Sequence, residues 1–166
     1  MTRNLRILAW NANSVAPKKA ELELFLHFNN TDVAAISETK LLPKNRFTMP
    51  GFKVYRSHRN QFGGGVMLLV NNNLRHDSFS LPHLTRLEAT AVCLQLQNHS
   101  QLLFVSAYLP PTTAITPTDL DTIFSLHDTV VLAGNLNCKH VLWNNASVNK
   151  NGNTLLSYCL NNTIHY

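Results

Sequence analysis

Charged residues are scarce in this 166-residue chain, since Asp, Glu, Lys and Arg together make up 14% of it. A disordered chain would be poorer in apolar residues than this one, in which they reach 45%, so we expect one folded domain over residues 1–166. The three cysteines are too few, and odd in number, for a disulfide framework. No apolar run is long enough to cross a bilayer and no basic-then-apolar leader opens the chain, which indicates an intracellular protein without a membrane partner.

The formal net charge is +5, and it is spread over the chain in small groups. Such a balance is typical of an ordinary solvated surface, but it also favours an anionic partner. Scattered cations suit sequence-independent attraction to a nucleic-acid phosphate backbone, which is the best functional interpretation. The groups are Lys18 and Lys19; Lys40, Lys44 and Arg46; Arg56, His58 and Arg59; Arg75 and His76; and Lys139 and His140.

Short apolar runs alternate with helical patterns along the chain. Buried strands are predicted at 5–10, 33–36, 66–70, 102–108 and 129–133, a further strand at 52–56, and a half-exposed strand at 92–97, where apolar and polar residues alternate. Helices are predicted from Pro17, with a stripe of Leu22, Phe25, Leu26 and Phe28, from Pro117, and over 154–160. Residues 164–166 resemble the beginning of a strand. This order predicts an α/β sandwich rather than an alternating barrel.

Polar residues stand where four of the apolar strands end. They are Asn11, Glu38, Tyr108 and the pair Asn135 and Asn137. In layered α/β folds such strand ends meet at one rim, where they would form a pocket able to hold a phosphate and a hard cation. Asn and Gly also interrupt strands in ordinary loops, so the spacing alone leaves both interpretations open.

The segments around these residues resemble, in order, motifs of the endonuclease/exonuclease/phosphatase superfamily, which contains DNase I and the apurinic/apyrimidinic endonucleases. The matching segments are 10–14, 36–40, 63–66, 107–110 and 132–137. The stretch 137–140, followed by Trp143, Asn149, Gly152 and Leu155–Leu156, resembles more narrowly the nuclease domain of insect jockey-like non-LTR retrotransposons.

This resemblance implies a DNase I-like, four-layer α/β sandwich of two mixed sheets with helices outside. It also implies Mg²⁺-dependent phosphodiester hydrolysis, in which Mn²⁺ can replace Mg²⁺. In the parent elements the domain nicks target DNA and a reverse transcriptase primes on the nick. The partners it implies are therefore DNA, bound mostly through its backbone, and a reverse transcriptase domain, with a nuclear location for a functional element.

The resemblance also assigns roles to the strand-end residues. Glu38 matches the metal-binding carboxylate and Asn11 the asparagine that helps to hold the metal. Tyr108 matches the tyrosine that donates to the phosphate, and Asn137 the asparagine that orients the attacking group. Asn135 departs from the pattern, because the family has Asp there to orient or deprotonate the attacking water.

An amide cannot take up that proton at neutral pH, so we expect little or no nuclease activity. The family's closing strands, with a further Asp and a Ser-Asp-His motif, have no counterpart before Tyr166, which leads us to expect a C-terminally incomplete domain. Besides a nuclease, the alternatives are a nucleic-acid-binding module without chemistry and a decayed reading frame. A phosphatase of the same superfamily is a further alternative, which the 139–143 segment disfavours. The Cys138 and His140 spacing fits no common zinc site, and Trp143 is more typical of loop packing than of base stacking.

Overall fold

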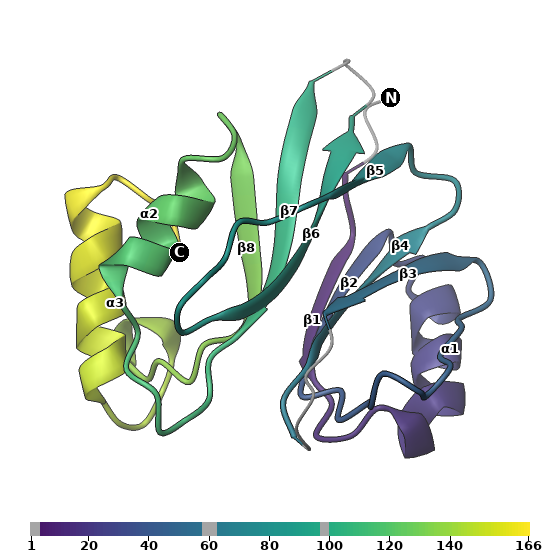
Figure 1. Ribbon diagram of the computed structural model, residues 1–166, viewed down its shortest axis with the longest axis horizontal. Helices are drawn as coiled ribbons and strands as arrows, with labels where there is room; N and C mark the ends of the chain where they lie inside the picture. Colours follow the sequence, from purple (N-terminus) through teal and green to yellow (C-terminus); the bar gives the residue numbers. More distant parts are fainter. Residues whose placement is uncertain (1–3, 58–62, 97–99) are drawn as a thin grey trace.

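The computed structural model describes residues 4–57, 63–96 and 100–166, which leaves the basic residues His58 and Arg59 outside the described part. The described residues form two sheets of four strands each, facing one another, with one helix on the outer side of the first sheet and two on the outer side of the second (Figure 1). This arrangement confirms the predicted α/β sandwich of two mixed sheets. In the residues described, no helix is both long and apolar enough to cross a membrane.

The first sheet is built from the N-terminal part of the chain in the order β1-β2-β4-β3. Its strands are β1 (Ile7–Asn11), β2 (Val33–Ser37), β3 (Phe52–Ser57) and β4 (Val66–Asn71), and β1 runs parallel to β2 while the other pairs are antiparallel. A 3₁₀ turn, η1 (Ala16–Lys18), leads into α1 (Lys19–Phe28). Leu22 and Leu26 of α1 pack on the outer face of the sheet, against Ile36 and Leu69.

The second sheet follows in the order β5-β6-β7-β8. Its strands are β5 (His76–Phe79), β6 (Glu88–Gln95), β7 (Gln101–Tyr108) and β8 (Val130–Asn135), and β7 and β8 are parallel. The helices α2 (Pro117–Phe124) and α3 (Lys150–Asn161) cover its outer face, with the 3₁₀ turn η2 (Val141–Trp143) between β8 and α3.

The space between the sheets is apolar at one end and polar at the other. At the apolar end Val33, Ala35, Leu68, Val92 and Phe104 pack together. Successive side chains of a strand point to opposite faces, so the strand that contributes Phe104 to this layer also contributes Ser106 and Tyr108 to it further along. The same alternation brings Ser37 after Ala35 and Asn11 after Ala9, so the strand-end polar residues gather at one end of the layer.

Several details differ from the sequence-based expectations. The strands β1 and β8 are not buried, because each lies at the edge of its sheet and has a partner on one side only; Ile7, for example, is 45% exposed. Phe25 and Phe28 do not join the buried stripe of α1, since Phe28 is 88% exposed. The residues 164–166 form no strand. Ile164 instead packs against the apolar residues between the second sheet and its helices α2 and α3, and the Tyr166 ring lies against the Trp143 ring.

Candidate active site

Asn11 and Glu38 lie together at the ends of two neighbouring parallel strands. Asn11 is the last residue of β1 and pairs in register with Ser37, the residue before Glu38. The Asn11 Nδ2 donates a hydrogen bond of 2.8 Å to the Glu38 Oε1. Asn11 is exposed and Glu38 is half-buried, so the carboxylate remains accessible from solvent. The two residues predicted to hold a metal ion are therefore in direct contact.

The loops around Asn11 and Glu38 contain several non-glycine residues whose backbone is in the left-handed φ/ψ region. Residues other than Gly, Asn and Asp are uncommon there. The backbone φ is +42° at Asn13, +83° at Ser14, +52° at Glu38 and +52° at Lys40. Backbone hydrogen bonds between the two loops hold this conformation, including Ser14 N to Glu38 O at 2.9 Å. Such strain is characteristic of binding sites, where the fold fixes a side chain in one direction.

Tyr108 and Asn135 end the two parallel strands of the second sheet. They face each other in register across β7 and β8, and Tyr108 is only 6% exposed. The Asn135 Oδ1 accepts from the backbone N–H of Asn137 at 2.9 Å, which closes a tight turn after the strand. The Asn137 Nδ2 donates to the Leu109 carbonyl at 2.8 Å, so the second asparagine is fixed as well.

A buried serine joins the two halves of this rim. The Ser37 Oγ accepts a hydrogen bond of 3.0 Å from the backbone N–H of Asn135, which lies in the other sheet. Because Ser37 precedes Glu38, this contact ties the Glu38 strand end to the Asn135 turn. The structure therefore brings the strand ends that carry Asn11 and Glu38 and those that carry Tyr108 and Asn135 to the same rim.

The site supplies oxygen ligands rather than nitrogen or sulfur. Within the described part of the chain, no three His, Cys, Asp or Glu side chains gather in a group that could hold a metal ion. The Asn11 Oδ1 accepts from the Asn13 backbone N–H at 3.1 Å and has a second lone pair, and the Glu38 carboxylate is half-buried. One carboxylate and one amide oxygen suit Mg²⁺, which usually keeps several waters and takes only one or two carboxylates from the protein.

Glu88 is a residue of this rim that the motifs did not reveal. It opens β6, pairs in register with Tyr108, and its Oε2 accepts from the backbone N–H of Gly65 at 2.7 Å. The strand assigned to 92–97 in fact begins at Glu88 and extends to Gln95. A lone acid at the start of an otherwise apolar strand is the signal that could have identified it.

The segment before Glu88 is held by a buried carboxylate on α2. Asp119, which is 2% exposed, accepts from the backbone N–H groups of Thr85, Arg86 and Leu87 at 2.7–2.9 Å and from the Thr85 hydroxyl at 2.9 Å. Burial works to raise the pKa of Asp119, but these donors together outweigh it and hold the pKa below its ordinary value. Asp119 thereby fixes the start of β6.

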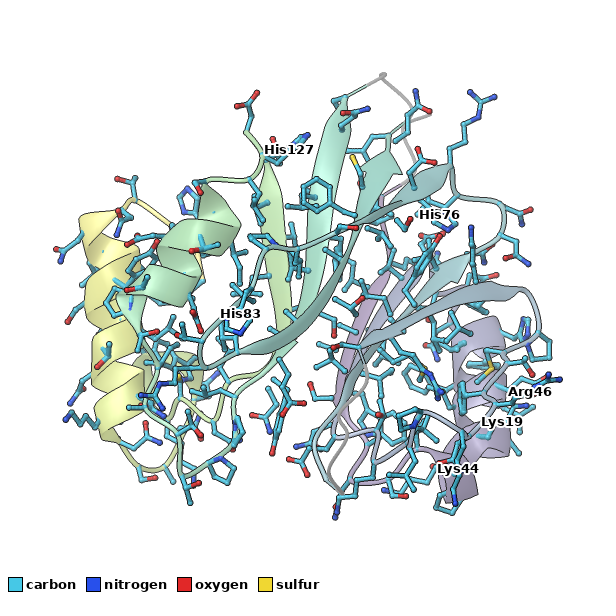
Figure 2. All side chains as sticks on the ribbon, viewed as in Figure 1. Lys19, Lys44, Arg46, His76, His83 and His127 are labelled. Carbon is cyan, nitrogen blue, oxygen red and sulfur yellow. The ribbon has the colours of Figure 1, made fainter. Side chains whose placement is uncertain are left out.

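Two lysines contact the loop that follows β1. The Lys18 ammonium donates to the Ala12 carbonyl, and the Lys40 ammonium donates to the Asn13 side chain. Lys19, Lys44 and Arg46 carry further positive charge beside α1, whereas His76 and His127 lie toward the opposite end of the molecule (Figure 2). Lys18 and Lys40 therefore place two positive charges at the loop that follows Asn11.

The segment between β8 and α3 packs around two polar side chains. Trp143 donates its indole N–H to the Cys138 carbonyl at 2.9 Å and contacts the His140 ring at 5.2 Å, so it serves loop packing as predicted. Asn149 caps α3 through Gly152 N at 2.7 Å and donates to the Asn137 carbonyl at 2.8 Å. The helix cap thus also supports the Asn135–Asn137 turn.

Comparison with known proteins gives the same fold, and a family model matches part of the chain. Residues 102–166 match the model of the endonuclease-reverse transcriptase family. The endonuclease domain of TRAS1, a telomere-specific non-LTR retrotransposon, superposes with a TM-score of 0.73 at 19% identity, over 95% of this chain and 71% of that one. The AP endonuclease LMAP from Leishmania major gives 0.60 at 18% identity, over 81% and 55% of the two chains.

Curated relatives have similar sequences over nearly the same span. The probable RNA-directed DNA polymerase from transposon X-element of Drosophila melanogaster is 28% identical over 164 residues, which is 96% of this chain and 18% of the relative. The RNA-directed DNA polymerase from mobile element jockey of the same species is 28% identical over 145 residues, 85% of this chain and 16% of the relative. The chain therefore spans less than a fifth of the length of these relatives.

The structure and these comparisons agree on a DNase I-like sandwich, whose strand ends carry Asn11, Glu38, Tyr108 and Asn137 in this order. The chain has the fold of endonuclease/exonuclease/phosphatase domains, and its sequence is similar to the corresponding part of jockey-like non-LTR retrotransposon proteins.

Proposed function

We propose that this chain is a Mg²⁺- and DNA-binding endonuclease domain in which hydrolysis is strongly impaired by Asn135. The observation that carries the proposal is the shared rim: the hydrogen-bonded Asn11 and Glu38 are tied through Ser37 to the turn that holds Asn135 and Asn137. In this proposal a hard-cation ligand set would stand beside the position at which the attacking water would have to be activated.

Glu38 and Asn11 are the residues that would hold the ion. Bound there, Mg²⁺ would polarise the scissile phosphate and stabilise the leaving oxygen. The left-handed backbone at Glu38 and the hydrogen bond from Asn11 restrict the carboxylate to one direction before any ion arrives. Such restriction lowers the entropy lost on binding.

Tyr108 and Asn137 would act on the substrate directly. The Tyr108 hydroxyl would donate a hydrogen bond to the phosphate, where negative charge increases in the transition state. Asn137 would orient the attacking group, and its amide is suited to this because a hydrogen bond to the Leu109 carbonyl fixes it.

Asn135 is the group that limits the reaction. Its Oδ1 accepts from the Asn137 N–H, a bond that a carboxylate would make equally well, so the turn does not require an amide. The amide cannot accept a proton from water at neutral pH. General-base catalysis contributes about 10²–10⁴-fold, so its loss would raise the barrier by about 3–5 kcal/mol.

The partner we propose is DNA, contacted mainly through its phosphate backbone. Lys18 and Lys40 lie next to the loop after β1, where they would neutralise phosphates on either side of the bound ion. By analogy with the curated relatives, which are RNA-directed DNA polymerases, the domain would serve a reverse transcriptase of the same element.

A plasmid-nicking assay in Mg²⁺ and in Mn²⁺ tests the impaired step. Asn135→Asp should raise the nicking rate by about 10²–10⁴-fold, and Asn135→Asp combined with Glu38→Gln should remove the gain. The same variants should also be tested in a longer protein that adds the closing strands implied by the family resemblance after Tyr166. Robust nicking by the unaltered chain would refute the impairment.

Binding without cleavage is the second candidate, favoured by Asn135 together with the lysines at the rim. Fluorescence anisotropy with a labelled duplex should show binding that weakens steeply as salt increases. Lys18→Ala and Lys40→Ala should each reduce the salt slope by about 1, while Arg75→Ala, on another part of the molecule, should not change it. Absence of binding at low salt would exclude this candidate.

A further inference from the structure

Two side chains cross between the sheets at the polar end of the inter-sheet layer, in opposite directions. Ser37 of β2 reaches the backbone of Asn135 in the second sheet, and Glu88 of β6 reaches the backbone of Gly65 beside the first. We call these two contacts the inter-sheet bridges. Neither residue has a role in the catalytic set described above.

The Ser37 bridge contacts three segments of the site. Its Oγ lies 3.0 Å from the Asn135 N and 3.5 Å from the Ala107 O, so it sits between the ends of β7 and β8. Its carbonyl accepts from the Ala12 N–H at 2.9 Å, in the loop that follows Asn11. The side chain is fully buried, so water does not compete for these hydrogen bonds.

The Glu88 bridge acts on the segment that follows Glu38. Its Oε2 holds the Gly65 N–H at 2.7 Å, and the Gly65 carbonyl in turn accepts from the Thr39 N–H at 3.2 Å. The adjacent Gly64 carbonyl accepts from the Lys40 N–H at 3.0 Å. A carboxylate in the second sheet is thus linked through one glycine loop to the residues next to Glu38.

Directional contacts are needed here because the rest of the inter-sheet layer is apolar. Packing of residues such as Val33, Leu68 and Phe104 favours closure of the layer but is not directional. A site assembled from two sheets requires its groups to be held within about 0.5 Å. Hydrogen bonds with defined donors and acceptors can set that register.

We propose that Ser37 and Glu88 are positioning residues, whose bridges fix the Asn11–Glu38 half of the site relative to the Tyr108–Asn135–Asn137 half. The importance of these bridges for catalysis rests on the proposed function. The hydrogen bonds themselves can be tested in the protein without metal or substrate. Glu88 acts as a hydrogen-bond acceptor for Gly65, and its negative charge is not what the site requires.

The chain offers a matched set of variants. Ser37→Ala and Glu88→Ala remove the bridges, whereas Ser37→Thr keeps the hydroxyl and Glu88→Gln keeps an acceptor oxygen without the charge. Ser106→Ala is the control, because Ser106 is equally buried on the neighbouring strand β7 and its Oγ has no hydrogen-bond partner in the described residues. Thermal unfolding of each variant shows whether it is folded before the site is measured.

The first measurement is made by ¹H–¹⁵N NMR on the metal-free chain. Ser37→Ala should accelerate hydrogen exchange at the Asn135 amide and shift the Asn11 side-chain amide, which reports the contact with Glu38. Glu88→Ala should accelerate hydrogen exchange at the Gly65 amide and should also shift the Asn11 side-chain amide. Ser37→Thr, Glu88→Gln and Ser106→Ala should leave the Asn11 signal unchanged. An unchanged Asn11 signal in both alanine variants would overturn the proposal.

The second measurement is a Mn²⁺ titration of the same samples. Both alanine variants should bind about 10-fold more weakly, as expected when the support of a metal ligand is removed, and both conservative variants should bind as the unaltered chain does. If Glu88→Gln binds as weakly as Glu88→Ala, the charge is essential and the positioning role is wrong. If the unaltered chain binds no Mn²⁺, the metal part of the proposed function fails, and the NMR measurement alone decides about the bridges.

Discussion

Replacing Asp119 by Asn should destabilise the protein by about 3 kcal/mol, because one buried carboxylate satisfies four donors. An asparagine can keep its oxygen on Arg86 and Leu87, but its NH₂ group then faces the Thr85 N–H, which loses its acceptor. One lost bond to a charged group costs about 1.5–3 kcal/mol. The remaining bonds weaken as well, since charge-assisted hydrogen bonds are roughly twice as strong as neutral ones.

Urea unfolding at pH 7 measures this loss. With a slope of about 2 kcal/mol per molar urea for a domain of this size, the midpoint should fall by about 1.5 M. Asp128→Asn is the control for the change in net charge, because Asp128 is exposed just beyond the same helix. That variant should keep its midpoint within about 0.3 M.

The pH dependence provides a second check with a defined sign. The folded pKa of Asp119 is depressed, so its stabilisation is complete above the unfolded value near 4 and is lost as the pH falls through the folded pKa. The difference between the unaltered chain and Asp119→Asn should therefore be constant from pH 7 to about pH 5 and shrink at lower pH. A difference below about 1 kcal/mol at pH 7, or one that persists undiminished at pH 2, would refute the reasoning.

Gly134→Ala should lower the free energy of unfolding, measured in urea, by roughly 3 kcal/mol or more, because a Cβ would lie 1.9 Å from the Ala107 carbonyl oxygen. Gly63→Ala is the control: a Cβ there would have nothing within 4 Å, so only about 1–2 kcal/mol, from left-handed backbone strain, should be lost. Equal losses would show that space at Gly134 is not limiting. Burial, reinforced by the neighbouring Cys159, raises the pKa of Cys138 to about 12. At pH 8 roughly 10⁻⁴ of this thiol is ionised, so Cys138 should resist iodoacetamide in the folded protein and react after unfolding, as mass spectrometry can measure; equal rates in both states would contradict the burial.

Strong apolar runs gave the most reliable predictions. β2 and β4 are fully apolar over Val33–Ile36 and Val66–Val70, and they lie at the centre of the first sheet as expected. The edge position of β1 could not be predicted, because an edge strand and a central strand have the same local sequence pattern when one face packs on a helix. The strand His76–Phe79 was missed because it contains almost no apolar residues and forms only by pairing with β6.

The positions of the site residues followed from a simple geometric rule, since parallel strands place their ends at the same rim. The rule predicts that Asn11 lies beside Glu38 and Tyr108 beside Asn135, and the structure places each pair together. Ser37 was not, because its importance depends on Asn135, 98 residues away in the chain and in the opposite sheet. Local patterns cannot reveal which buried hydroxyl will meet an N–H group across a sandwich.

The division of the chain between the sheets has a consequence for how the site comes into being. Every strand of the first sheet precedes Asn72 and every strand of the second follows it, within the residues that the structure describes. A single cut at the Asn72–Asn73 turn would therefore yield two fragments, one carrying Glu38 and the other Tyr108, Asn135 and Asn137. Neither fragment would contain a complete site, and protection of the Asn135 amide, which donates to the Ser37 hydroxyl, would report their reassembly on mixing.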